Sequence, residues 1–119
     1  MKEENIIQDK SYAFALRIVN LNKLLIEQNK EYTLGKQILR SGTSIGANIE
    51  EAIGDQSRND FKAKLSISYK EARETKYWLR LLRDSKLLNS DLAASLLQDC
   101  EELLKIIDSI LKTLKNPHS

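Results

Sequence analysis

The sequence has few of the residues that interrupt helices or cross-link small folds. Its 119 residues include one proline, one cysteine and four glycines, and aromatic residues make up 6%. The single cysteine, Cys100, cannot form an internal disulfide, and a single proline leaves long helices possible. With 41% hydrophobic residues, the composition is typical of a mostly helical globular domain. We therefore expect one all-α domain, since this length can bury a modest core without metals or disulfides.

Long apolar runs are also missing. No stretch approaches the roughly 20 apolar residues needed to cross a bilayer. The opening segment 1–5 lacks the basic and apolar regions of a secretory signal. We therefore expect no membrane association and a reducing, cytoplasmic location.

Residues for catalysis or metal binding are scarce. The one histidine, His118, follows Pro117 near the C-terminus, where it cannot serve as the rigid base of a catalytic triad. The acidic cluster at 50–55 lacks the Glu-x-x-His pairs of di-iron bundles. No basic neighbour in sequence would activate the thiol of Cys100. We therefore expect a protein that is not an enzyme and that holds no metal or cofactor.

Apolar residues recur at helical spacing in four segments, which predicts four helices at about 10–28, 32–53, 58–86 and 91–115. Short connections predict that consecutive helices run antiparallel, as an up-down-up-down bundle. Residues 1–8 and 116–119 are expected to be frayed tails. Helix boundaries are indicated by Asp9 as a first cap, Gly54 as a stop, Ser57 with Asp60 as a cap, and Pro117 as the final stop.

The second predicted helix contains a run of very small residues at 41–48. Its two glycines, Gly42 and Gly46, each cost roughly 1 kcal/mol relative to alanine in a helix interior. One explanation is the close approach of a neighbouring helix, within the subunit or between subunits. A phosphate cradle is the alternative, but the Gly-Lys-Ser/Thr ending of a Walker loop is absent. Ser44, Asn48 and Glu51 are interpreted as structural, with Asn48 and Glu51 held by neighbouring side chains.

Charge is distributed unevenly along the chain. Basic and acidic residues number 7 and 8 in residues 1–56, 9 and 4 in residues 57–86, and 3 and 5 in residues 87–119. The third predicted helix therefore carries most of the positive charge. At 100° per residue it resolves into three faces. Its core face is Phe61, Leu65, Ser68, Ala72, Thr75, Leu79 and Leu82.

The second face of this helix is basic. A solvated surface is the ordinary explanation for such a face, and binding of nucleic acid phosphates is the rival. Tyr69 lies among the cations, where it would either stack on an unpaired base or cover apolar neighbours. Lys36 and Arg40 of the preceding helix are possible additions to the predicted binding residues, which are Arg58, Lys62, Tyr69, Arg73, Lys76, Arg80 and Arg83.

The third face combines charged residues with Ile67, Trp78 and Leu81. Large apolar groups on a second side of a helix are hard to bury within one subunit. These three residues therefore predict an interface between copies of the chain, with Trp78 as its anchor. In the alternative, Trp78 lies against a helix of its own chain.

The segment from Tyr32 to Ala52 resembles the signature of four-helix-bundle proteins encoded by intervening sequences in bacterial 23S ribosomal RNA genes. The residues that match its pattern, including the continuation into the third helix, are Leu34, Gln37, Arg40, Ser44, Ile45, Ala47, Asn48, Ile49, Glu51, Ser57, Arg58, Phe61 and Leu65. The sequence departs from the pattern at Leu39, Gly46 and Ala52, where arginine, proline and glycine are common.

The resemblance implies a ring-like homo-oligomer, a pentamer, with a positively charged surface. Relatives include the accessory protein of diversity-generating retroelements, which looks like a partner of nucleic acid and of a reverse transcriptase. Together with the basic face, this predicts a non-enzymatic oligomer that binds structured RNA or DNA through phosphates. The alternative is a protein-interaction or scaffold module with no nucleic-acid role.

Overall fold

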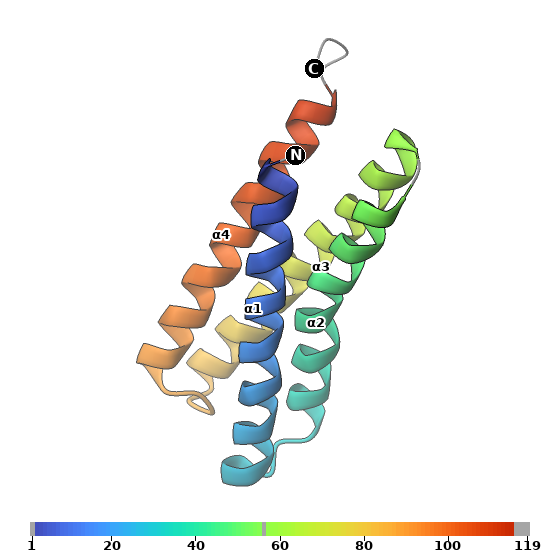
Figure 1. Cartoon of the computed structure of the whole chain (residues 1–119). Coiled ribbons are helices and arrows are strands. Elements are labelled where there is room, and N and C mark those ends of the chain that lie inside the picture. Colours follow the sequence, from blue (N-terminus) through green and yellow to red (C-terminus); the bar gives the residue numbers. More distant parts are fainter. Residues whose placement is uncertain (1, 56, 116–119) are drawn as a thin grey trace.

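The structure is a computed structural model that describes residues 2–55 and 57–115. Four helices and one π-helical turn make up almost all of this part: α1 (Lys2–Leu24), η1 (Leu25–Asn29), α2 (Thr33–Gly54), α3 (Arg58–Asp84) and α4 (Ser90–Lys115). Consecutive helices run in opposite directions, so the start of α1 and the end of α4 lie at the same end of the bundle (Figure 1). The predicted all-α, up-down-up-down four-helix bundle is confirmed.

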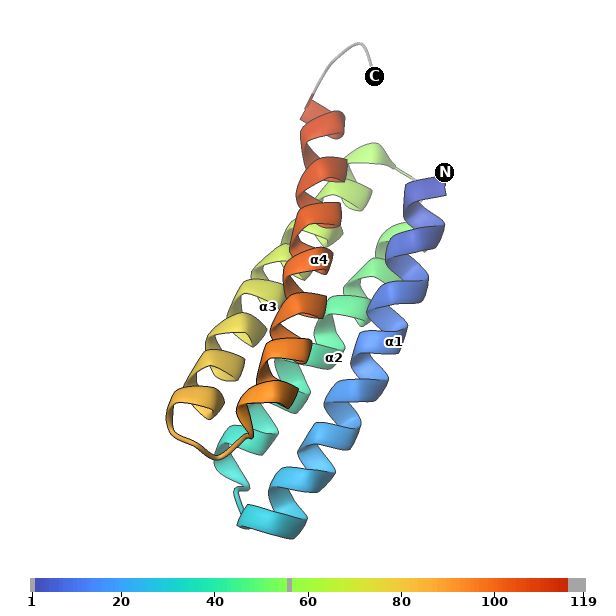
Figure 2. The ribbon, with the colours of Figure 1, turned by 90° about the vertical axis from the view of Figure 1, so that its left-hand side faces the viewer.

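The bundle is elongated, measuring 50 × 21 × 19 Å along its principal axes. Turning it by 90° shows α3 and α4 side by side, with α1 and α2 next to them (Figure 2). All four helices contribute to one apolar core. None of the described helices combines the length and the apolar character needed to cross a membrane.

The α2–α3 pair has the most extensive contact in the bundle. Small polar side chains lie buried along it. The hydroxyl of Ser68 donates to the carbonyl oxygen of Ile45 at 2.8 Å, and that of Thr75 donates to the hydroxyl of Ser41 at 2.9 Å. Because these buried hydroxyls have partners, they let the two helices pack closely without leaving polar groups unsatisfied.

Gly42 and Gly46 of α2 face α1. A Cβ atom on Gly42 would lie 2.8 Å from both Cγ1 and Cγ2 of Ile18, and one on Gly46 would lie 3.4 Å from Ser11. These distances confirm the predicted close approach of a neighbouring helix, and the neighbour is α1 of the same subunit.

The α1–α4 seam is the least extensive contact between neighbouring helices. Two ion pairs bridge it, Arg17 with Asp99 at 2.6 Å and Lys10 with Glu102 at 3.0 Å. Three hollows of about 150, 210 and 230 Å³ lie along the same seam. The α1–α4 seam therefore combines ion pairs with small hollows.

The N-terminal prediction was wrong. Helix α1 begins at Lys2, and Asp9 lies inside it rather than capping it. The reason is Ile7, which is 1% exposed and extends the buried face of α1 one heptad before Phe14. At the other end, α4 is described to Lys115, so the predictions for the 116–119 tail, Pro117 and His118 lie outside the described residues.

Caps define the other helix starts. The Ser57 hydroxyl accepts a hydrogen bond from the amide of Asp60 at 3.0 Å, as predicted. The carboxamide oxygen of Asn89 caps α4 by accepting from the amide of Leu92 at 2.8 Å, so α4 begins at Ser90, one residue before the predicted start. Gly54, the predicted stop, is the last residue of α2, and α3 ends at Asp84.

Candidate nucleic-acid interface

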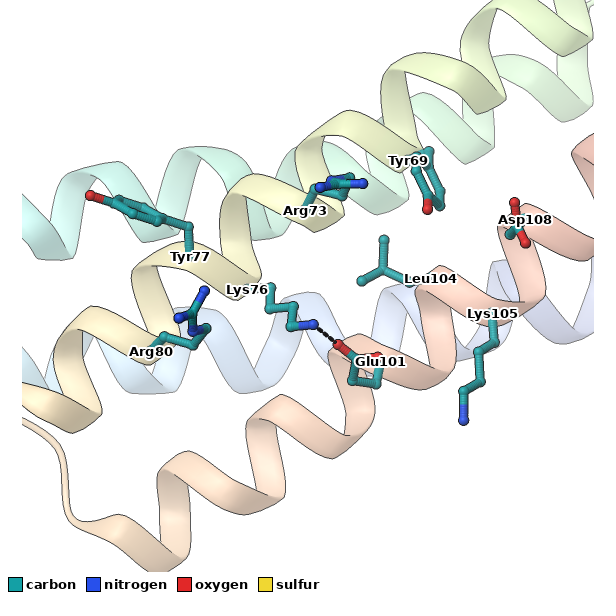
Figure 3. A pocket seen from close by; sticks show the side chains of 9 residues that line it. All are labelled: Tyr69, Arg73, Lys76, Tyr77, Arg80, Glu101, Leu104, Lys105 and Asp108. Carbon is teal, nitrogen blue, oxygen red and sulfur yellow. Dashed lines mark ion pairs between the residues drawn. The ribbon is translucent and has the colours of Figure 1, made fainter.

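A cleft of about 450 Å³ lies between α3 and α4. Figure 3 shows that one wall is made by α3 and the other by α4. The lining residues are Tyr69, Arg73, Lys76, Tyr77, Arg80, Glu101, Leu104, Lys105 and Asp108. Four of the nine, Tyr69, Arg73, Lys76 and Arg80, belong to the predicted nucleic-acid-binding set.

The α3 wall is basic because of its helical register. Leu65, Ala72 and Leu79 of α3 are buried in the core, and Arg73 and Arg80 lie about 100° around the helix from Ala72 and Leu79. Both arginines are exposed, and neither forms an ion pair with another described residue. Lys76 lies between them and pairs with Glu101 of α4. We call Arg73, Lys76 and Arg80 the cationic row.

The α4 wall carries acidic groups and the floor is apolar. Glu101 holds Lys76, and Asp108 pairs with Lys112 at 2.9 Å, which raises the pKa of that lysine. Leu104 lies between these two acids along the cleft floor (Figure 3). Lys105 also lines the cleft, with its ammonium group turned away from α3 (Figure 3). The side chains that face the cleft are therefore mainly basic on the α3 wall and acidic on the α4 wall.

Three other predicted cations lie outside the cleft lining. Arg58 donates to the carbonyl oxygen of Leu114 at 2.7 Å, close to the end of α4. Arg83 pairs with Asp84 at 2.8 Å, and this pairing raises the pKa of Arg83 and lowers that of Asp84. Lys62 is half-buried near the start of α3. The structure thus concentrates the predicted basic face into the shorter cationic row.

The structure separates the two α2 cations from this row. Arg40 pairs with Glu71 at 3.0 Å and also with Glu74, both on the side of α3 that faces α2. The indole N–H of Trp78 donates to Glu74 at 2.9 Å. This bond, with that from Arg40, lowers the pKa of Glu74, and the Glu74 bond in turn raises the pKa of Arg40. Lys36 is exposed on α2 and does not line the cleft, so these two predicted binding residues lie apart from the cationic row.

The predicted oligomer-interface residues share one side of α3, the side that also carries Glu71 and Glu74. Ile67 is 42% exposed, whereas Trp78 and Leu81 are half-buried. Trp78 packs against the core of its own chain, with its ring 5.1 Å from that of Tyr77 in an edge-to-face arrangement. Tyr77 itself is 52% exposed. Ile67 and Tyr77 are therefore the large apolar groups of α3 most open to a partner.

The residues interpreted as structural form contacts within the subunit. Ser44 donates to the carbonyl oxygen of Arg40 at 2.6 Å, and Asn48 donates to that of Ser44 at 2.9 Å. Glu51 pairs with Lys64 of α3 at 3.2 Å. Asn48 therefore bonds along its own helix, and Glu51 helps to join α2 to α3.

Sequence reasoning missed Tyr77 and the α4 residues of the cleft. Tyr77 directly follows Lys76 and lies three residues before Arg80, which was an available signal. No equivalent signal marks Glu101, Lys105 or Asp108, because their role depends on α4 packing beside the basic face. Elsewhere, burial raises the pKa of Cys100 to about 12, and the described residues include no group of His, Cys, Asp and Glu arranged to hold a metal.

Comparison with known proteins extends this description. The family described as 23S rRNA-intervening sequence protein matches residues 3–109. Similar solved structures include a protein of unknown function from the S23 ribosomal protein family of Bacteroides thetaiotaomicron VPI-5482. It is 51% identical, with a TM-score of 0.91, over 92% of this chain and 98% of that one. No curated protein shows significant similarity.

Proposed function

The chain belongs to the 23S rRNA-intervening sequence protein family, and from that premise we propose that it is a non-enzymatic, self-associating protein that binds structured RNA or DNA through phosphates. The observation that carries the proposal is the cationic row on one wall of the α3–α4 cleft. Arg73 and Arg80 are exposed, and neither forms an ion pair within the described part of the chain. Exposed guanidinium groups of this kind form bidentate hydrogen bonds with phosphate.

The spacing of the row suits an extended polyanion. Arg73 and Arg80 are seven residues apart on one helix, which places them roughly 10 Å apart along its axis. Each phosphate that meets a cation releases condensed counterions, so affinity falls steeply as salt rises. Such contacts recognise shape and charge rather than base sequence.

Self-association is the second part of the proposal. Ile67 and Tyr77 are large exposed apolar side chains of α3 that a second copy would cover. The family resemblance makes a pentameric ring the expected assembly. Several copies would repeat the cationic row and so strengthen phosphate binding through multivalency. We also propose a cytoplasmic location, because the single cysteine forms no internal disulfide.

The test is a fluorescence-anisotropy titration with a structured RNA and a duplex DNA over a series of salt concentrations. We expect the parent to bind both at low salt, with affinity that falls steeply as salt rises. The Arg73→Glu/Arg80→Glu variant should lose at least roughly tenfold in affinity, because repulsion replaces two phosphate contacts.

The matched control is Lys23→Glu/Lys30→Glu, which makes the same charge change at an exposed position of α1 and at the exposed residue after η1. It should retain most of the parent affinity. Equal losses of affinity in the two double variants would show that the effect comes from net charge. The cationic row would then not be the binding surface.

A protein-interaction module is the second candidate, and one observation favours it. Tyr12 and Leu16 of α1 are 64% and 51% exposed, and they lie one turn apart on the same face. Absence of binding to either nucleic acid at low salt, with folded protein, would favour this candidate. By family resemblance, a reverse transcriptase is one such protein partner.

A further inference from the structure

We propose that the α3–α4 cleft holds a single unstacked nucleotide, with its phosphate on the cationic row and its base over Leu104 beside Tyr69. This inference rests on the proposed function and makes it more specific, because it names the chemical unit that the cleft receives. Its volume of about 450 Å³ falls within the range of roughly 300 to 1,000 Å³ typical of small-molecule pockets.

The opposed walls of the cleft carry the argument. The α3 wall presents Arg73 and Arg80, whereas the α4 wall presents the carboxylates of Glu101 and Asp108, the first paired with Lys76 and the second with Lys112. A ligand that offers only phosphates would use the arginines and leave the carboxylates without a hydrogen-bond donor from the ligand. A nucleotide satisfies both, since it has a phosphate at one end and hydrogen-bond donors on its ribose and, in most cases, its base.

The floor of the cleft suits the flat face of a base. Leu104 is 9% exposed, and the ring of Tyr69 extends from α3 toward α4 above it (Figure 3). Tyr69 is half-buried and packs against the core, so its ring is held in place. Bases stack on aromatic side chains of this kind, but only when they are not already stacked within a duplex.

The measurement compares two RNA hairpins that differ only in a three-nucleotide bulge. Anisotropy titrations at one salt concentration give the ratio of dissociation constants, paired over bulged. We expect the parent to prefer the bulged hairpin by roughly tenfold, as base stacking on an aromatic side chain predicts. Tyr69→Leu should bring the ratio close to one, whereas Tyr69→Phe, which keeps the ring, should preserve it.

Tyr12→Leu is the matched control, because it removes an exposed tyrosine from α1, away from the cleft. Its ratio should equal that of the parent. Circular dichroism confirms that each variant keeps its helical content before its binding is compared.

Asp108→Ala distinguishes a cleft that attracts phosphates alone from a cleft that receives a whole nucleotide. The two predict opposite changes in affinity for the bulged hairpin. If the cleft attracts phosphates alone, removing this carboxylate and freeing Lys112 should tighten binding to both hairpins. If Asp108 accepts a hydrogen bond from the nucleotide, the bulged hairpin should bind about threefold or more weakly while the paired hairpin binds as well or better.

The nucleotide can come from a strand or from solution, and competition distinguishes these sources. Adenosine monophosphate that displaces the bulged hairpin at concentrations where ribose 5-phosphate does not would identify free nucleotide as a ligand. Displacement by neither, with the preference for the bulge intact, would identify a strand-borne nucleotide. Both outcomes support the cleft as a nucleotide site.

Equal binding of the two hairpins, unchanged by Tyr69→Leu, would overturn this inference. Loss of that binding in Arg73→Glu/Arg80→Glu would then leave the proposed function standing. Failure of the parent to bind either hairpin at low salt would overturn both.

Discussion

At the scale of single residues, Gly42 marks the tightest approach of α1 to α2. An added methyl group would lie 2.8 Å from two carbon atoms of Ile18, whose side chain is fully buried and cannot move aside. We therefore expect Gly42→Ala to lower the free energy of unfolding by about 1 to 3 kcal/mol, the usual cost of overpacking. Urea denaturation followed by circular dichroism measures it.

Gly54→Ala is the matched control for this prediction. No atom lies within 4 Å of the position where its Cβ would be, and its φ is not positive. Alanine also has a higher helix propensity than glycine, so stability should stay the same or rise by up to about 1 kcal/mol. Equal destabilisation by the two substitutions would contradict a steric role for Gly42.

Cys100 is a residue whose environment determines its chemistry. Its thiol is fully buried, donates to the carbonyl oxygen of Ala72 at 3.3 Å, and has its pKa raised by desolvation to about 12. We expect the native protein to react with a thiol reagent at pH 8 only as fast as it unfolds. Rapid labelling without denaturant would show that the site opens locally.

The raised pKa also predicts a pH dependence. Above pH 9 the unfolded thiol loses its proton while the folded thiol keeps it, so the unfolded state is favoured as pH rises toward about 12. The free energy of unfolding should therefore fall more steeply between pH 8 and 10 in the parent than in Cys100→Ala. Identical slopes would indicate that the thiol does not contribute.

At the scale of the element, α3 shows what one helix can reveal from sequence. Its apolar and small residues recur at helical spacing, so the buried face from Leu65 to Leu82 was predictable before any neighbour was known. The sequence did not show which neighbouring residues its charged faces would meet. Arg40 pairs with Glu71 and Glu74 of α3, which lie 31 and 34 positions further along the chain. The sequence alone could not show that these acids, and not the cationic row, are its neighbours.

The acidic wall of the cleft illustrates the same limit. Glu101 and Asp108 occupy a polar face of α4 that would be unremarkable on an isolated helix. They become part of a site because the fold sets them opposite the cationic row. The start of α1 was missed for a local reason, since the polar residues before Ile7 outweighed the one buried side chain that continues its core face.

Helix capping gives a prediction at this scale. The Asn89 side chain accepts a hydrogen bond from the amide of Leu92, so Asn89→Ala should lower the free energy of unfolding by about 1 kcal/mol. Ser90→Ala, one residue later and already inside α4, should change it by less than about half of that. Thermal unfolding of the two variants decides between them, and a larger effect at Ser90 would move the cap there.

At the scale of the whole molecule, the exposed side chains of α3 predict how copies associate. Ile67→Asp places a charge on the side chain proposed to contact a second copy. If the chain self-associates there, the variant should form a smaller species than the parent, since burying an unpaired carboxylate is costly. Light scattering coupled to size-exclusion chromatography measures the mass of both proteins.

Asn20→Asp is the control for the assembly, because it adds the same charge at an exposed position of α1. It should have the mass of the parent. An Ile67→Asp variant whose mass also equals that of the parent would remove this surface from the interface.

The sparse seam between α1 and α4 has a consequence for how the bundle forms. Its ion pairs connect residues 82 and 92 positions apart, whereas the tightly packed α2–α3 hairpin closes over a short loop. Contacts between distant residues carry the larger loop-closure entropy and form late. We expect the α2–α3 hairpin to nucleate folding and the α1–α4 seam to close last, so the amide protons of α1 and α4 should exchange with solvent deuterium before those of α2 and α3.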